Sequence, residues 1–333
     1  MRGAAQHISS QRTPFGHMPL QQQFIFKSAP FKECHASTIA ETATGDLMAA
    51  WFGGTKEGAP DVGIWASRSR SGRWTKPVEV AKEQDTPCWN PVLFLGPDQA
   101  MWLFYKVGAN PRSWSGAYLR SNDEGRSWSA PVILPAGLLG PIKNKPILAS
   151  DGRVLCPTSV ESYRAWTGWV ESLNPDGTNW QRFGPIAYPG TNCGLIQPTL
   201  IEINPGRVRA FLRSTKLIGC ICVADSMDGG RTWSPARRTV LPNPNSGIDA
   251  VRLSSGAVAM VYNHTDCART PLNVAISHDH GETWGKPKVL EDGAGEYSYP
   301  AAIQTSDGLI HATYTYQRRK IRHCTFTEDW LNE

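Results

Sequence analysis

The chain has 333 residues, 40% of them hydrophobic, with 13 Trp and 10 Phe, so it carries enough apolar side chains for a large core. A formal net charge of +5 is mild for this length, and the sequence has no dense Lys/Arg block. No segment reaches the roughly 18 apolar residues of a membrane-spanning helix. We therefore expect neither a nucleic-acid partner nor a membrane partner.

The first 20 residues contain no apolar segment typical of a signal peptide. We expect residues 1–20 to be a flexible leader and residues 21–333 to be a single domain. A cytoplasmic location is expected, although a trimmed signal and secretion stay possible. The sequence makes no prediction about the oligomeric state.

The remaining chain consists of short apolar segments separated by Gly, Pro and polar turns, which is typical of β-strands. The first of them is QFIFKS at 23–28. Five groups of four follow, at 36–42, 47–54, 61–68 and 77–82; 91–96, 101–107, 116–121 and 131–135; 145–150, 153–159, 166–172 and 184–188; 198–203, 207–214, 220–226 and 237–241; and 249–255, 258–264, 272–277 and 288–292. A last group has three strands, at 300–306, 309–316 and 321–327.

An eight-residue pattern, Ser-x-Asp-x-Gly-x-(Ser/Thr)-Trp, recurs between these strands and ends at Trp128, Trp233 and Trp284. Degenerate copies end at Trp74 and Trp180, so that the tryptophans are 51 to 54 residues apart. In each copy the Asp can accept backbone hydrogen bonds within its own turn, and the Gly can adopt a positive φ. These Asp-box residues are therefore expected to be structural.

A repeat of about 50 residues with four strands predicts an all-β fold, a six-bladed β-propeller. The last blade lacks one strand, and the strand at 23–28 is left over at the other end of the chain. Pairing the two closes the ring and removes two exposed sheet edges.

In such a blade the innermost strand begins on the same face of the disc where the second strand connects to the third. Functional side chains are expected on this face, around an axial pocket. The starts of the inner strands carry Cys34-His35, Trp89-Asn90, Asn144-Lys145, Gln197, Asp249 and Tyr297 to Tyr299. The connections between second and third strands carry Glu57, Asp61, Lys106, Ser159, Glu161, Arg213, Asn263, His264, Arg269, Arg318 and Arg319.

Arg213 stands out because it ends the apolar run VRAFL, where a buried guanidinium without an anion would be costly. It is the strongest candidate for contact with an anionic ligand. Together, the residues expected to bind substrate are Arg213, Arg269, Asn90, Lys145, Gln197, Asp249, Asn263, His264, Glu296 and Arg318.

The repeats and this rim resemble the sialidase superfamily over roughly residues 24–330. The resemblance implies that Arg213 and Arg269, the latter in CARTPLNVAIS, bind a substrate carboxylate. It also implies that Tyr297, in EYSYP, is the nucleophile and that Asp61 or Glu57 is the acid/base.

Two positions depart from the family pattern. His35, in FKECHAST, lies where the family has its first arginine, and Gln197 stands where it has the glutamate that activates the tyrosine. An amide cannot accept the phenol proton, so this mechanism loses its general base unless Glu161 or Glu296 replaces it.

The leading hypothesis is an exo-acting glycoside hydrolase that removes a terminal acidic sugar, with no cofactor and no metal. A polysaccharide lyase or a His-based glycosidase acting on uronate glycans, with His35 and His264 as acid and base, is the second. A non-catalytic sugar-binding propeller is the third. In all three the partner is a carbohydrate, most simply an anionic one.

Overall fold

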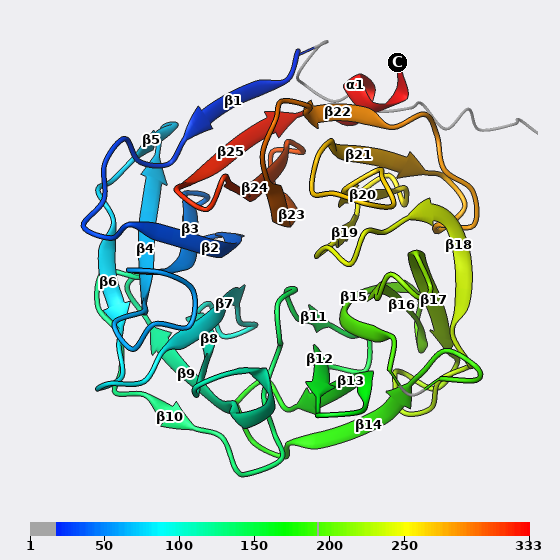
Figure 1. Cartoon of the computed structure of the whole chain (residues 1–333), viewed down its shortest axis with the longest axis horizontal. Coiled ribbons are helices and arrows are strands. Elements are labelled where there is room, and N and C mark those ends of the chain that lie inside the picture. The colour runs from blue at the N-terminus through cyan, green and yellow to red at the C-terminus, as the bar shows by residue number, and fades with distance from the viewer. Residues whose placement is uncertain (1–17, 192) are drawn as a thin grey trace, which may run out of the picture.

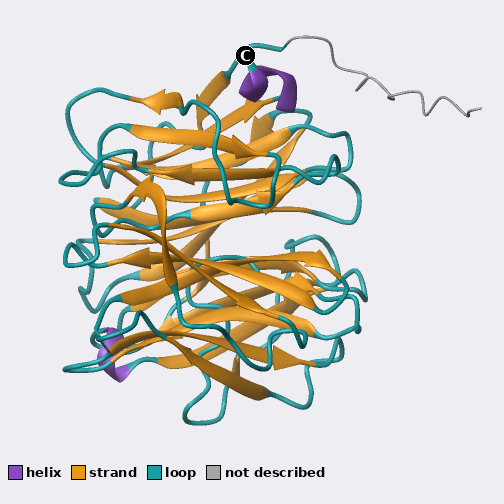
Figure 2. Cartoon of the chain, turned by 90° about the vertical axis from the view of Figure 1, so that its right-hand side faces the viewer, coloured by secondary structure: helices purple, strands orange, loops and turns teal. Residues whose placement is uncertain are grey.

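The computed structural model describes residues 18–191 and 193–333. Their strands form six antiparallel sheets around a central axis (Figure 1). Seen from the side, the strands cross the disc and loops cover both of its faces (Figure 2). The predicted all-β six-bladed propeller is therefore confirmed. Residues 1–17 of the expected leader lie outside the described residues.

Each blade is built from consecutive strands, except for the last, which also takes β1 (Gln21–Phe24). Blade one comprises β2 (Glu33–Glu41), β3 (Leu47–Gly54), β4 (Gly63–Arg70), β5 (Arg73–Trp74) and β6 (Val78–Ala81). Blade two comprises β7 (Cys88–Leu95), β8 (Met101–Val107), β9 (Ser115–Ser121) and β10 (Val132–Ile133). Blade three comprises β11 (Ile147–Leu148), β12 (Val154–Glu161), β13 (Trp166–Leu173) and β14 (Gln181–Ile186). Blade four comprises β15 (Leu195–Asn204), β16 (Arg207–Ser214), β17 (Cys220–Ser226) and β18 (Arg237–Pro242); blade five comprises β19 (Asp249–Arg252), β20 (Val258–Tyr262), β21 (Leu272–Ser277) and β22 (Lys288–Glu291); blade six adds β23 (Tyr297–Gln304), β24 (Ile310–Tyr316) and β25 (Lys320–Phe326). A short helix η1 (Pro111–Ser113) lies between β8 and β9, and α1 (Glu328–Asn332) follows β25.

The ring closes where β1 pairs with β25, in the register Gln21↔Thr325 to Phe24↔Arg322. The expected closing strand is thus present, two residues earlier than the apolar pattern indicates. Ile25 and Phe26, which belong to that pattern, follow β1 and pack into the core between blades six and one. This pairing covers the edge of β25 and makes β1 the outermost strand of blade six.

The apolar core lies between the blades. One of its clusters packs Met48 and Phe52 of blade one against Leu93 and Leu103 of blade two. Comparable clusters lie between the other neighbouring blades. Because each sheet is covered on both faces, hydrophobic residues follow one another along its strands instead of alternating strictly with polar residues.

The Asp-box turns hold the outer corners of the blades. In blade four the amide of Thr232 donates to Asp228 Oδ1 at 2.8 Å, and its hydroxyl donates to Asp228 Oδ2 at 2.6 Å. Blades two and five repeat these bonds at Asp123 and Asp279. The glycine of the turn is required because its φ is positive and because a side chain would not fit. At Gly281, for example, an added Cβ would collide with the ring of Phe211.

Blade three departs from the expected pattern. Its inner strand β11 has two residues, although the sequence predicts a strand over 145–150. The preceding segment, residues 139–146, runs toward the centre of the ring, where it bonds to several other blades as well as to its own. These bonds across the axis outweigh the local preference for a strand.

A buried histidine pair in blade six generates a prediction. The rings of His311 and His323 stack at 5.2 Å, and burial lowers the pKa of His311 to about 4 and that of His323 to about 3. Unfolded histidines bind protons near pH 6.5, so stability contributed by this pair is present above about pH 6.5 and is lost as the pH falls toward 4.

Measured by urea unfolding between pH 7 and pH 4, the free energy of unfolding of the wild type should fall with a slope that is smaller in His323→Gln. The His278→Gln variant, at an exposed position, serves as the control. An unchanged slope in His323→Gln would contradict this prediction.

Candidate active site

Four inner strands share an irregularity at the face where the sequence predicts the site. The register slips between His35 and Thr38, Trp89 and Val92, Ile196 and Thr199, and Ser298 and Ala301. Within these bulges Ala36, Asn90, Gln197 and Tyr299 have positive φ of 55°, 39°, 51° and 53°. A bulge bends the strand and redirects a side chain, and here it does so repeatedly around the axis.

Tyr299 is the centre of the resulting cluster. Its phenol oxygen accepts a hydrogen bond from Arg213 Nη1 at 2.8 Å and lies 3.4 Å from Gln197 Nε2. Arg213 Nη1 also donates to Gln197 Oε1 at 2.9 Å, and Arg213 Nε donates to Asn245 Oδ1 at 2.9 Å. Arg213 is only 6% exposed, so these neutral partners hold a largely buried guanidinium whose charge they do not cancel.

Two further arginines come from blades five and six. Arg269 Nη1 donates to Glu296 Oε1 at 2.7 Å, Arg318 Nε donates to Glu296 Oε2 at 3.1 Å, and Arg318 also pairs with Glu57. Burial acts to raise the pKa of Glu296, but the two arginines bring it below its ordinary value. The Arg269 guanidinium lies 5.5 Å from the centre of the Tyr299 ring.

His35 packs against the ring of Tyr299, with 4.1 Å between the ring centroids. Its Nδ1 is 2.9 Å from Thr315 Oγ1. Burial and then the positive charges of Arg318, Arg269, Arg213 and Lys143 hold the pKa of His35 well below its usual range. His35 is therefore neutral at physiological pH.

Glu161 carries a carboxylate for which no hydrogen bond or ion pair is found among the described residues. Burial raises its pKa, and the charge of Arg213 acts in the opposite direction. Glu161 thus faces the arginine that contacts Tyr299 and is suited to accept a proton.

The geometry does not favour Tyr297 as the nucleophile. Tyr297 is 2% exposed, its hydroxyl donates to the carbonyl of Ala294, and its ring packs against Tyr316. Side chains alternate along a strand, but the bulge after Ser298 puts Tyr299 at the axis. Tyr297 therefore lies outside the cluster, and Tyr299 is the tyrosine that lies beside Arg213 and Arg269.

The two candidates for the acid, Asp61 and Glu57, differ in the partners of their carboxylates. Asp61 Oδ2 accepts hydrogen bonds from the amide and the hydroxyl of Thr55, at 2.9 and 2.6 Å, and the Thr55 bonds lower its pKa. Asp61 therefore stabilises its own turn. Glu57, on the same connection, reaches Arg318 and joins the cluster.

The other predicted binding residues lie around the cluster in structural networks. Lys145 pairs with Asp249 at 2.9 Å, and Asp249 also accepts from the hydroxyl of Thr199. Asn90 donates to the carbonyl of Ile142, and Asn263 donates to that of Tyr297. His264 is exposed, with its Nδ1 2.6 Å from the hydroxyl of Tyr262.

A sequence signal for Tyr299 exists. Asn90, Gln197 and Tyr299 are each followed by proline, in WNPVL, IQPTL and YPAAI. Aligning the inner strands on this proline puts Tyr299, and not Tyr297, level with Gln197. Asn245 and Thr315 carry no comparable signal, because they come from a loop and from a second strand.

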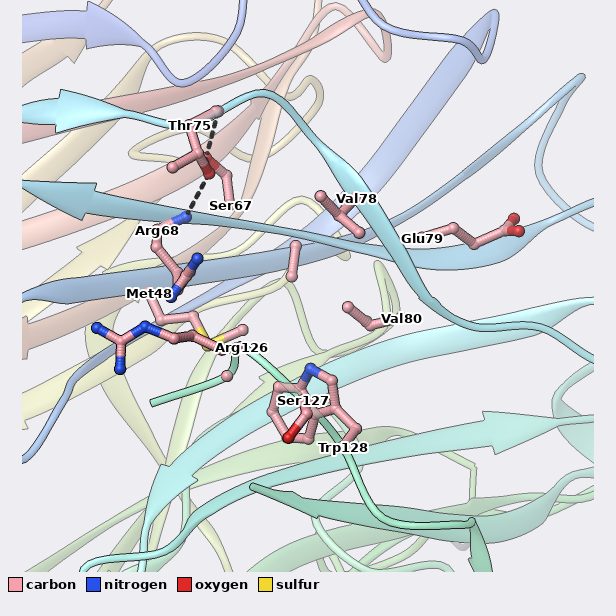
Figure 3. Close-up of a pocket in the computed structure, with 12 residues that line it drawn as sticks. Met48, Ser67, Arg68, Thr75, Val78, Glu79, Val80, Arg126, Ser127 and Trp128 are labelled. Atoms are coloured by element: carbon pink, nitrogen blue, oxygen red, sulfur yellow. Dashed lines mark hydrogen bonds between the residues drawn. The ribbon is translucent and has the colours of Figure 1, made fainter. Parts of the chain in front are cut away.

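A cavity of about 300 Å³ opens elsewhere, between blades one and two (Figure 3). Its walls include Met48 and Arg68 of blade one and the Asp-box turn from Gly125 to Trp128 of blade two. Because Asp-box turns lie on the face opposite the starts of the inner strands, this cavity is separate from the Tyr299 cluster.

Residues 18–191 and 193–333 hold no group of three or more His, Cys, Asp or Glu side chains placed to bind a metal ion. They also include no helix long and apolar enough to cross a membrane.

Comparison with known proteins identifies relatives of this chain. The family model described as a BNR repeat-like domain matches residues 45–312. A sialidase from Bacteroides fragilis is 24% identical over 225 residues, which are 62% of this chain and 40% of that protein. A sialidase from Micromonospora viridifaciens is 27% identical over 168 residues, 46% of this chain and 24% of that protein. The matched part is thus less than half of each curated relative.

Solved structures agree on the fold. A protein of unknown function from Dyadobacter fermentans has a TM-score of 0.78 at 18% identity, covering 92% of this chain and 99% of that one. The NanB sialidase from Streptococcus pneumoniae also has a TM-score of 0.78, at 13% identity, covering 93% of this chain and 71% of that one.

The cluster predicts binding of a carboxylate. Glucuronate or N-acetylneuraminate, compared with chloride at equal ionic strength, should raise the melting temperature of the wild type, because a ligand at about 100 times its Kd adds about 2.7 kcal/mol. Arg213→Ala should remove this shift, and Arg252→Ala, at an exposed position of β19, should keep it. An equal shift in Arg213→Ala, or none with either acid in the wild type, would contradict the prediction.

Proposed function

The chain belongs to the BNR repeat-like domain family, and we propose that it is a sialidase-like glycoside hydrolase that removes a terminal acidic sugar from a glycan. The observation that carries the proposal is the 2.8 Å bond from Arg213 to the phenol oxygen of Tyr299, with Arg269 beside the ring. The sialidases among its relatives support the same class of reaction.

In this proposal Arg213, Arg269 and Arg318 bind the sugar carboxylate. Arg318 takes the place of the first family arginine, where this chain has His35. Bidentate guanidinium contacts with a carboxylate are strong because both partners are charged. The carboxylate would replace part of the charge that Glu296 supplies to Arg269 and Arg318 in the ligand-free site.

Tyr299 is the proposed nucleophile. Its oxygen attacks the anomeric carbon while the bond from that carbon to the leaving oxygen breaks and Glu57 protonates the leaving group. The phenol proton passes through water to Glu161, and Arg213 stabilises the negative charge on the phenol oxygen. Water then attacks the glycosyl-enzyme and gives a proton to Glu57 while the bond from the anomeric carbon to Tyr299 breaks, and the released phenolate takes back its proton from Glu161.

A panel of aryl glycosides of sialic acid, 2-keto-3-deoxy sugars, rhamnose and glucuronate tests the activity. Turnover should appear on an acidic member of the panel and not on rhamnose. Tyr299→Phe should lower kcat/KM by on the order of 1,000-fold or more, because it removes the nucleophile. Tyr297→Phe is the matched control and should keep most of the activity. The reverse order of the two variants would refute the assignment, and no turnover on any glycoside would favour a sugar-binding propeller.

The acid is tested by a second matched pair. Glu57→Gln should lower kcat by about 100- to 10,000-fold on substrates with poor leaving groups. The loss should be much smaller on aryl glycosides with an acidic phenol, which departs without protonation. Asp61→Asn should leave kcat nearly unchanged. A large loss in Asp61→Asn with none in Glu57→Gln would show that the two roles are exchanged.

One observation favours a lyase as the second candidate. Gln197 replaces the expected glutamate, and neutral His35 lies beside Tyr299. In a lyase a base removes the proton next to the uronate carboxylate, and the glycosidic oxygen on the adjacent carbon leaves with its electrons, creating a double bond. Ultraviolet absorbance by an unsaturated uronate, formed from a uronate polymer and abolished in His35→Ala, would support this reaction over hydrolysis.

A further inference from the structure

Lys143 buries an ammonium group on the axis of the ring. The residue is 2% exposed. Its Nζ donates to Asn144 Oδ1 at 2.8 Å, to the carbonyl of Ile248 at 2.8 Å and to the carbonyl of Pro300. Each of its three N–H groups thus has an acceptor, which is the arrangement that a buried ammonium needs.

One of these acceptors belongs to the peptide next to Tyr299. Pro300 lies inside the bulge where Tyr299 has a φ of 53°, a conformation that a tyrosine rarely adopts without external support. The two side chains also lie close together at Gly247, where an added Cβ would be 3.3 Å from Lys143 Cε and 3.4 Å from the Tyr299 ring. Lys143 therefore contacts the backbone and the surroundings of Tyr299 but not its phenol oxygen.

The segment that carries Lys143 is itself fixed. Lys106 Nζ donates to the carbonyl of Pro141 at 2.7 Å, and Glu171 accepts from the amide of Gly140 at 2.7 Å. Asn144 Nδ2 donates to the carbonyls of Gln197 and Pro198, at 3.1 and 2.9 Å. The same short segment thus holds the bulges of both Gln197 and Tyr299, in blades four and six.

We propose that Lys143 is a positioning residue for Tyr299, which it acts on through the carbonyl of Pro300. This inference rests on the proposed function of Tyr299 as nucleophile. Burial lowers the pKa of Lys143 to about 7, and Asp249 acts in the opposite direction. The three hydrogen bonds of Nζ offset part of the cost of burying this charge. The bond to Pro300 holds the backbone that orients Tyr299 beside Arg213, and a displacement of about 1 Å in such a group can cost on the order of 100-fold in rate.

Lys143→Met keeps the length of the side chain and removes its three donors. The control is Lys286→Met, which makes the same change at an exposed position away from the axis. Lys143→Met should lower kcat on the order of 100-fold with little change in KM, whereas Lys286→Met should keep kcat within a few-fold.

A second readout does not need turnover. Protein labelled with 3-fluorotyrosine gives one ¹⁹F resonance for Tyr299, which is assigned by its absence in Tyr299→Phe. This resonance should shift or broaden in Lys143→Met and stay in place in Lys286→Met. If Lys143→Met does not fold, Lys143→Gln, which keeps one amide donor, replaces it and should show a smaller change of the same kind.

The two proposals fail in different ways. An unperturbed Tyr299 resonance in Lys143→Met, or equal changes in the two lysine variants, would overturn the positioning role. Absence of turnover on every glycoside would overturn the proposed function, while the ¹⁹F comparison would still decide what Lys143 does to Tyr299.

Discussion

Backbone polar groups that are buried at the axis must find partners inside the protein, because neither a neighbouring strand nor water is available to them there. The bulges in β15 and β23 leave the carbonyls of Gln197, Pro198 and Pro300 without ladder partners, and the carbonyl of Ile248 lies just before β19. The segment before β11 supplies the missing donors, from Asn144 and Lys143. The inner strand of blade three is therefore only two residues long, because the residues before it form these bonds instead of extending the strand. The orientation of the side chains above the axis depends on these bonds.

Charge is arranged around the same point in two layers. At the base, Lys145 and Asp249 neutralise each other and bond to neighbouring backbone. Above them, Arg269 and Arg318 share Glu296, whereas Arg213 has only neutral hydrogen-bond partners. Burial, and then the positive charges of this site, lower the pKa of His35. An anion entering this site would meet at least one buried guanidinium whose charge is not already cancelled.

Much of this architecture follows from the sequence, because the Asp-box spacing determines the number of blades and the blade topology determines which strand ends share a face. The same reasoning names Arg213, Arg269, Arg318, Glu57, His35 and Gln197, which the structure brings together around Tyr299. Tyr297 and Asp61 lie outside this cluster, because a bulge inserts a residue into the strand of Tyr297 and because the Asp61 carboxylate bonds to its own turn. The role of Lys143 could not be predicted, since its partners are carbonyls of blades five and six, more than 100 residues away.

The replacement of a glutamate by Gln197 has a physical consequence beyond the loss of a base. A carboxylate at this position would form an ion pair with Arg213 and compete with Tyr299 for its donors. The amide instead accepts from Arg213 through Oε1 and leaves the full guanidinium charge beside the phenol oxygen. In the proposed mechanism Arg213 stabilises charge on that oxygen, while proton removal falls to a more distant group. Two tasks that a glutamate would combine are thus separated, and the second is assigned to Glu161, which is half-buried near Arg213 without an ion pair in the described part of the chain.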